Sequence, residues 1–207
     1  MEPNTEESRQ ALILNFWFGD LKEGDVPPEE LSRMWWAKDE KTDEYIRANF
    51  GSDLIAAKEG RLHEWEKAPR GTLALIVLLD QFSRNMYGDT PGAFSQDSRA
   101  LEIAVSGIEK GFDKDLHPVM RVFFYMPFMH SENLDMQKRS LKLFKSLERE
   151  FTSPPGLAGM LSSNRDYAER HYAIIERFGR YPHRNRILGR ESTPEETEFL
   201  KQPGSSF

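Results

Sequence analysis

Apolar residues recur at three- and four-residue steps along most of the chain, which is the spacing of amphipathic helices. Proline or a capping side chain opens many of these stretches, and glycine closes most of them. The pattern predicts about nine helices with short connections and no convincing strand. We therefore expect an all-α protein whose helices stack as antiparallel pairs.

The first third of the chain carries several amphipathic stretches. The first opens with a capping box at Asn4 and Glu7 and ends near Phe18. A charged helix is predicted over 39–50, where a glycine closes it, and one or two further turns cover 53–59. Four tryptophans on or beside these apolar stripes are expected in the core: Trp17, Trp35, Trp36 and Trp65.

The run 73–79 is apolar on every side, and its alanine and leucine content predicts a buried central helix. Its C-terminal end turns polar abruptly. Asp80 and Arg84 are four residues apart, as are Gln81 and Asn85, so the members of each pair would lie on one side of a helix. Removing these side chains from water is costly unless they form hydrogen bonds or ion pairs with one another or with a ligand. Both readings remain open: a helix end closed by an Asp80–Arg84 ion pair, or part of a binding site.

Proline and glycine also divide the second half of the chain into helices. Pro118 opens one that Pro127 should stop or kink. Another is predicted from about 133 to 151. The next carries His171 on an otherwise apolar stripe and should end before Gly179, a residue suited to a left-handed C-terminal cap.

The segment 177–190 reverses the charge of the chain locally. It holds five arginines, a histidine and an asparagine without one acidic residue, although the net charge of the protein is −6. Guanidinium groups bind carboxylates and phosphates through two parallel hydrogen bonds. The partners of these arginines are therefore either carboxylates elsewhere in the chain or an anionic ligand.

Length and composition limit the class of protein. We expect residues 1–207 to form a single all-helical domain, because no Gly/Ser linker or charge block divides them. The absence of cysteine excludes disulfides, thiolate nucleophiles and cysteine metal sites. No apolar run approaches the roughly 20 residues of a membrane helix, and the start of the chain does not resemble a signal peptide. A cytoplasmic protein is expected, with no membrane or nucleic-acid partner, since the pI is near 5.5.

Four motifs in order make the chain recognisable. They are Phe16-Trp-Phe-Gly19, Asp80-Gln-Phe-Ser-Arg-Asn85, Pro127-Phe-Met-His-Ser-Glu132, and Phe178-Gly-Arg-Tyr-Pro-His-Arg-Asn185 with Leu188-Gly-Arg190. Their combination resembles a bacterial family catalogued as domain of unknown function 924, and the resemblance covers about 11–207. It implies an all-helical fold of tetratricopeptide-like type and no established activity.

Polar residues in and near these motifs are the candidates for a site. His183 or His130 would act as general acid or base, with Glu132 or Asp80 fixing the tautomer. Water would be the nucleophile, and no local spacing predicts a metal or a cofactor. The candidates to hold and orient a phosphate or carboxylate ligand are Asp80, Gln81, Arg84, Asn85, His171, Arg180, Arg184 and Asn185.

Three functional hypotheses follow, and the sequence leaves open whether the protein is an enzyme and what its oligomeric state is. The first is a pocket for a small anionic ligand, with or without hydrolytic activity. The second is a tetratricopeptide-like scaffold that binds acidic peptides or C-termini. The third is purely structural: the basic segment links the last helix to the body through Asp80, Glu132 or Glu191. Only the third predicts that Arg184→Ala unfolds the protein.

Overall fold

The computed structural model describes residues 5–22 and 24–206, and this part of the chain contains helices and connections but no strand. The predicted all-α class is confirmed. The helices are α1 (Thr5–Phe18), α2 (Glu29–Trp36), α3 (Glu40–Lys58), α4 (Pro69–Ile76), α5 (Ser83–Tyr87), α6 (Asp97–Glu109), α7 (Pro118–His130), α8 (Leu134–Glu150), α9 (Pro155–Phe178) and α10 (Pro194–Phe199).

Short helical segments connect several of these helices. A π-helical segment, η2 (Val77–Phe82), joins α4 to α5, so the three form one rod, and the described residues contain nine helices when that rod is counted once. The 3-10 segments are η1 (His63–Lys67), η3 (Pro91–Phe94), η4 (Phe112–Asp115) and η5 (Pro182–Arg184). The predicted capping box at Asn4 and Glu7 lies outside the described side chains.

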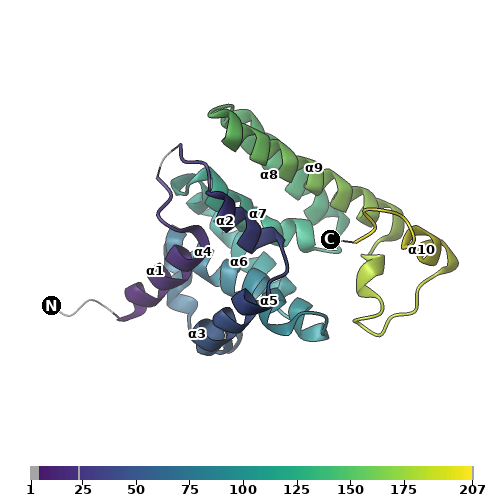
Figure 1. Cartoon of the computed structure of the whole chain (residues 1–207), viewed down its shortest axis with the longest axis horizontal. Coiled ribbons are helices and arrows are strands. Elements are labelled where there is room, and N and C mark those ends of the chain that lie inside the picture. The colour runs from purple at the N-terminus through teal and green to yellow at the C-terminus, as the bar shows by residue number, and fades with distance from the viewer. Residues whose placement is uncertain (1–4, 23, 207) are drawn as a thin grey trace.

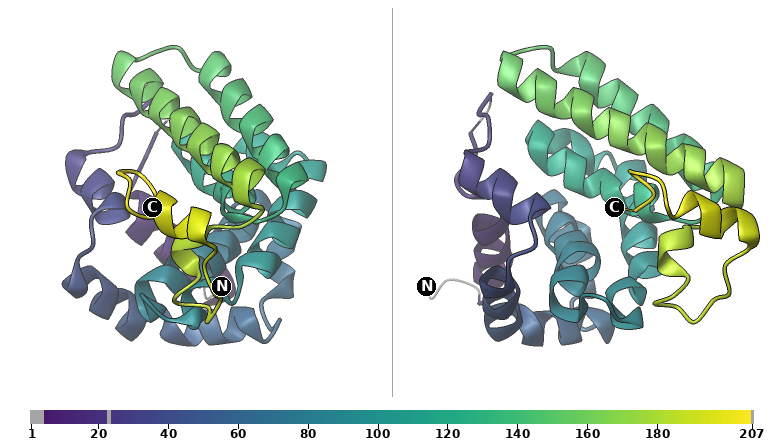
Figure 2. Two further views of the ribbon diagram at one scale, coloured as in Figure 1. Left: turned by 90° about the vertical axis from the view of Figure 1, so that its right-hand side faces the viewer. Right: turned by 45° about the vertical axis from the view of Figure 1, so that its right-hand side comes forward.

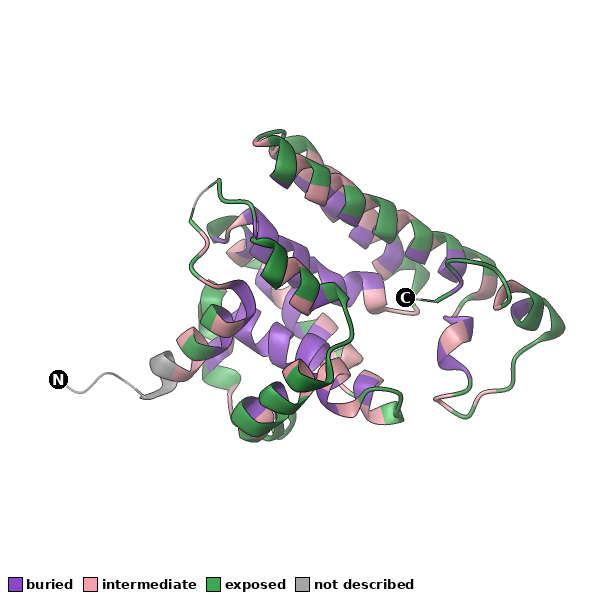
Figure 3. Ribbon diagram, viewed as in Figure 1, coloured by how far each residue is buried: buried purple, intermediate pink, exposed green. Residues whose placement is uncertain are grey.

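The core is built around the α4–η2–α5 rod and α7. The run 73–79 is at most 2% exposed, as predicted for a buried central helix. Figure 3 shows these two elements as the mainly buried centre, with exposed surfaces on α3, α8 and α9 around them. Helices α8 and α9 form an antiparallel pair (Figures 1 and 2), which is compatible with tetratricopeptide-like stacking. Within the described residues, no helix combines the length and apolar character that a bilayer span requires.

The predicted helix break after residue 50 was wrong, because α3 runs without interruption over Glu40–Lys58. Gly51 lies inside this helix. A glycine in a helix costs only about 0.5–1 kcal/mol relative to alanine. Burial of Phe50 and Leu54 on either side contributes more than this, at about 1.5–3 kcal/mol for each side chain. Packing therefore decides the conformation.

Pro127 was predicted to stop or kink α7, and it does not stop the helix, which continues to His130. Proline inside a helix costs about 3 kcal/mol. However, every residue of α7 from Pro118 to Met129 is buried, so this helix gains packing on all its faces. The continuation matters for the site, since it places His130 at the last position of α7.

Three of the four tryptophans predicted in the core are buried: Trp17, Trp35 and Trp65. The prediction was wrong for Trp36, which is 57% exposed and stacks on Phe123 with 6.0 Å between ring centroids. Trp35 and Trp36 are adjacent in the short helix α2, so their side chains point in directions about 100° apart. Only one of them can face the core.

Candidate functional site

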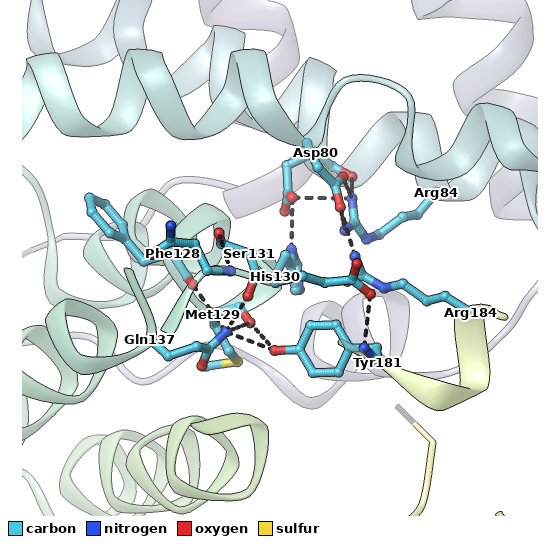
Figure 4. A network of polar contacts seen from close by, with 12 residues as sticks. Asp80, Arg84, Phe128, Met129, His130, Ser131, Gln137, Tyr181 and Arg184 are labelled. Atoms are coloured by element: carbon cyan, nitrogen blue, oxygen red, sulfur yellow. Dashed lines mark hydrogen bonds and ion pairs between the residues drawn. The ribbon is translucent and has the colours of Figure 1, made fainter. Parts of the chain in front are cut away.

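The side chains at the centre of the candidate site come from four separate elements. Asp80 belongs to η2, His130 ends α7, Asp97 begins α6, and Arg184 ends η5. Figure 4 shows the ring of His130 directed at Asp80, with Arg84 and Arg184 on the same side of the network. The fold thus brings together three of the four recognised motifs.

Asp80 is fully buried and holds three neighbours. His130 Nδ1 lies 2.7 Å from Asp80 Oδ1, and Arg84 Nη1 lies 3.1 Å from the same oxygen. Gln81 Nε2 donates to Asp80 Oδ2 at 2.5 Å. The predicted Asp80–Arg84 ion pair is therefore present. The carboxylate sits in a π-helical segment, a rare conformation that is frequent at functional sites.

The Asp80–His130 contact fixes the protonation of both groups. Burial opposes ionisation of Asp80, but the charge of Arg84 and the contact with His130 hold the pKa of this carboxyl below its ordinary value. Burial lowers the pKa of His130, and this outweighs the opposite effect of Asp80. The imidazole is therefore neutral at pH 7. Because a carboxylate can only accept, Nδ1 carries the hydrogen, and Nε2 is left with its lone pair.

The end of α7 is held in place by two side chains from other elements. Gln137 of α8 donates to the carbonyl oxygens of Met129 and Ser131, at 2.7 Å each. The hydroxyl of Tyr181 donates to Met129 O at 2.5 Å, and its oxygen lies 2.8 Å from Nε2 of Gln137. These bonds satisfy carbonyls that a helix end leaves free. They hold the backbone on both sides of His130.

Arg184 is only 6% exposed, although it carries a charge. Its guanidinium lies between the rings of Phe94 and Tyr181, 4.7 Å and 4.5 Å from their centroids. Nη1 donates to Asp97 Oδ2 at 3.2 Å, and the buried Nε has no hydrogen-bond partner among the described residues. Burial lowers the pKa of Arg184 from its ordinary value. The two rings offset part of the lost hydration.

A cavity of about 280 Å³ opens beside this network. Its size is near the lower end of the range for small-molecule sites. Three of the predicted site residues line it: His130, Glu132 and Arg184. The other residues in the lining are Pro91, Phe94, Ser95, Asp97, Ser98, Leu101, Ser131 and Leu188.

Of the eight predicted ligand-binding residues, Arg184 is the one in the described lining of this cavity. Asp80, Arg84 and His171 stand in or beside the network, and the other four have contacts elsewhere. Asn85 donates to Asp43 of α3 at 2.7 Å, and Gln81 serves Asp80. Arg180 makes two bonds to Glu196, of 2.6 Å and 2.8 Å, and Asn185 also donates to Glu196 at 3.3 Å. Arg180 and Asn185 therefore fix the basic segment to α10.

Two further histidines stand beside the network. The ring of His171 is 6.3 Å from that of His130 and 5.5 Å from that of Tyr181. Burial lowers the pKa of His171 to about 3 and that of His183 to about 4. Of the two candidate acid–base residues, His130 is the one that contacts Asp80.

The basic segment is largely neutralised within the chain. Arg190 makes two bonds to Glu132, of 2.7 Å and 2.9 Å, and Arg177 pairs with Glu195 at 2.8 Å. The hydrogen bonds from Arg180 lower the pKa of Glu196 to about 2. Carboxylates elsewhere in the chain are thus partners of Arg177, Arg180, Arg184 and Arg190. Glu132 was among the three partners expected for this link.

Sequence reasoning missed three contributors to the site: Phe94, Asp97 and Tyr181. Asp97 contacts both Arg84 and Arg184, but a carboxylate in the first turn of a helix is also the ordinary partner of the helix dipole. Tyr181 lies inside the motif that contains Arg184, and this position was the one available signal.

Comparisons with known proteins place the chain in a family. The family described as bacterial protein of unknown function, DUF924, matches residues 13–204. The solved structure of a protein of unknown function from Agrobacterium tumefaciens is 34% identical in sequence, with a TM-score of 0.78. That match covers 94% of this chain and 98% of the other. No curated protein matches the chain. The chain therefore belongs to the DUF924 family of bacterial proteins.

Proposed function

We propose that this protein binds a small ligand bearing a carboxylate or phosphate group in the cavity beside His130, with Arg184 as the anchor. One observation carries the proposal. A guanidinium has five N–H groups, and the buried Arg184 directs one of them to a described residue, Asp97. Keeping a charged group buried with so few hydrogen bonds is costly. A ligand oxyanion would supply the missing acceptors.

The Asp80–His130 pair supports a hydrolytic reaction on that ligand. Asp80 holds the imidazole in one tautomer, and neutral Nε2 can take a proton from a water molecule. His130 and Arg184 line the same cavity, so a ligand bound at Arg184 would lie near this base. Water would attack an ester or amide carbonyl carbon, or a phosphorus atom, of the bound ligand, and its proton would pass to Nε2. The bond from that atom to the leaving oxygen or nitrogen would break, and the leaving atom would take the proton back from Nε2.

The alternative of a scaffold for acidic peptides has less support. It needs free arginines along a groove, but Arg177, Arg180 and Arg190 are engaged with Glu195, Glu196 and Glu132. A convergent pocket with one under-used arginine fits the contacts better than an extended groove does.

The test is a thermal-shift measurement on the wild type, Arg184→Ala and Arg177→Ala. The ligands are small monocarboxylates, dicarboxylates, phosphate monoesters and acidic peptides. A saturable rise in Tm with a small anion is expected for the wild type and for Arg177→Ala, and its loss for Arg184→Ala. Arg177 is the matched control, because it lies in the same basic segment and pairs with the exposed Glu195.

The stability of unliganded Arg184→Ala distinguishes a binding site from a structural link. Asp97 keeps two contacts from Arg84, of 3.0 Å and 3.1 Å, so its charge stays compensated when Arg184 is removed. The proposal therefore predicts an unliganded Tm equal to or above that of the wild type. A much lower Tm, with no ligand effect on the wild type, would show that Arg184 is only structural.

A further inference from the structure

The charges around the cavity balance one another. Arg184 is the cation among the described residues that line it. Arg84 and Arg190 do not line the cavity, but all three arginines contact at least one of three carboxylates. These carboxylates are Asp80, Asp97 and Glu132. Since His130 is neutral, three positive and three negative charges give a sum of zero. The charge of this network is therefore balanced, in contrast to the strongly positive segment 177–190 taken alone, and its members that line the cavity are Asp97, Glu132 and Arg184.

Two carboxylates of this balanced set line the cavity together with Arg184. Glu132 accepts two bonds from Arg190 and one from the backbone N–H of Tyr181, at 2.8 Å. Asp97 lies between Arg84 and Arg184. A single ligand charge can bind at Arg184. A second negative charge would face Asp97 or Glu132, and both Arg84 and Arg190 are already engaged.

Four apolar residues form one part of the remaining lining, beside Ser95, Ser98, Ser131 and His130. Pro91 and Phe94 of η3, Leu101 of α6 and Leu188 all border the cavity. Phe94 also stacks on the guanidinium of Arg184, so the apolar wall begins directly beside the anion anchor. A ligand that binds at Arg184 would place its next atoms against this wall.

From these observations we infer the ligand class: a small monocarboxylic acid with an apolar body, rather than a dicarboxylate or a phosphate ester. The inference rests on the proposed function, because it takes Arg184 as the anchor. The carboxylate lies against Arg184, and the apolar body packs against Phe94, Leu101 and Leu188. The volume of about 280 Å³ matches a body that consists of a short chain or one ring.

Isothermal titration calorimetry with matched acids tests this class. The probes are straight-chain monocarboxylates from acetate to octanoate, the dicarboxylates of equal length, and alkyl phosphates. Affinity for the monocarboxylates should rise about threefold to fourfold with each buried methylene until the cavity is full. Each monocarboxylate should bind at least about fivefold more tightly than the dicarboxylate of its length.

A substitution at the cavity border tests the charge argument separately. Ser98 lines the cavity and is exposed, so the fold tolerates a longer side chain there. Ser98→Lys adds one positive charge and should reverse the preference, with dicarboxylates gaining at least about fivefold relative to monocarboxylates. Ser98→Gln adds similar bulk without charge, and it should keep the wild-type preference.

The outcomes separate this inference from the proposed function. Tighter binding of dicarboxylates or alkyl phosphates to the wild type would overturn the ligand class, yet it would leave an anion pocket at Arg184. Affinity independent of chain length would also overturn it. If none of the probes binds to the wild type, both the ligand class and the anion pocket are wrong.

Discussion

At the scale of single residues, Asp80 organises the site. Its buried carboxylate forms an ion pair with Arg84 of the same helical rod and accepts a hydrogen bond from the neighbouring Gln81. It also contacts His130 at the end of α7. The spacing of Asp80 and Arg84 predicted their ion pair, since residues four apart are neighbours on a helix. His130 is 50 residues away, and no spacing rule connects it to Asp80. From the sequence, either His130 or His183 could pair with either Asp80 or Glu132.

Replacing this carboxylate should be strongly destabilising. Asp80→Asn removes the fully buried one of the two carboxylates that pair with Arg84, and breaking a buried ion pair typically costs about 3–5 kcal/mol. Urea unfolding should show this loss in the free energy of unfolding. The control is Asp20→Asn, because the Asp20 side chain is 92% exposed, and it should change stability by less than about 0.5 kcal/mol. Equal effects of the two substitutions would contradict the assigned role of Asp80.

At the scale of elements, local signals predicted the end of α9 correctly but overestimated the effect of a glycine or proline inside a helix. Gly179 ends α9 in a left-handed conformation with φ of 68°, as expected. By contrast, α3 continues past Gly51 and α7 past Pro127, because tertiary packing outweighs the local preference. The second case decides where His130 lies. The end of α7 could be predicted correctly only if the burial of this helix were known. The apolar spacing within one segment does not show how other helices pack around it.

The packing of α6 against its neighbours gives a prediction at this scale. A Cβ added to Gly107 would stand 2.5 Å from Cζ of Phe124 in α7 and 3.1 Å from Cγ2 of Thr72 in α4. Gly107→Ala should therefore destabilise the protein by about 1–3 kcal/mol through overpacking. Gly159→Ala in α9 meets no atom within 4 Å and should stabilise by about 0.5–1 kcal/mol. Thermal or urea unfolding checks the opposite signs, and a stabilising Gly107→Ala would contradict this packing.

At the scale of the whole molecule, the site depends on contacts between distant parts of the chain. Arg184 and Asp97 are 87 residues apart, and Arg190 and Glu132 are 58 apart. The sequence predicted the all-α class and offered internal carboxylates as partners of the basic segment. The packing of η5 against η3 and α6 determines which arginine has N–H groups without a hydrogen-bond acceptor. Only the folded chain provides that information.

Buried neutral histidines give the whole molecule a characteristic dependence on pH. Burial lowers the pKa of His171 to about 3, and in the unfolded chain this group titrates near 6.5. The unfolded state therefore binds more protons below pH 6.5, so stability should fall as the pH is lowered. For His171 the loss between pH 7.5 and pH 5 is about 2 kcal/mol. The lowered pKa values of His130 and His183 act in the same direction.

Carboxylates do not obscure this effect, because Asp80, Glu132 and Glu196 have ordinary values of 4.5 or below and are lowered further by folding. Their contribution is lost only at more acidic pH. Urea unfolding of the wild type should therefore give a lower free energy of unfolding at pH 5 than at pH 7.5. In His171→Gln this decrease should be smaller by about 2 kcal/mol. His63→Gln, which replaces an exposed histidine of η1, should behave as the wild type does. An unchanged pH dependence in His171→Gln would mean that this histidine is not held neutral by burial.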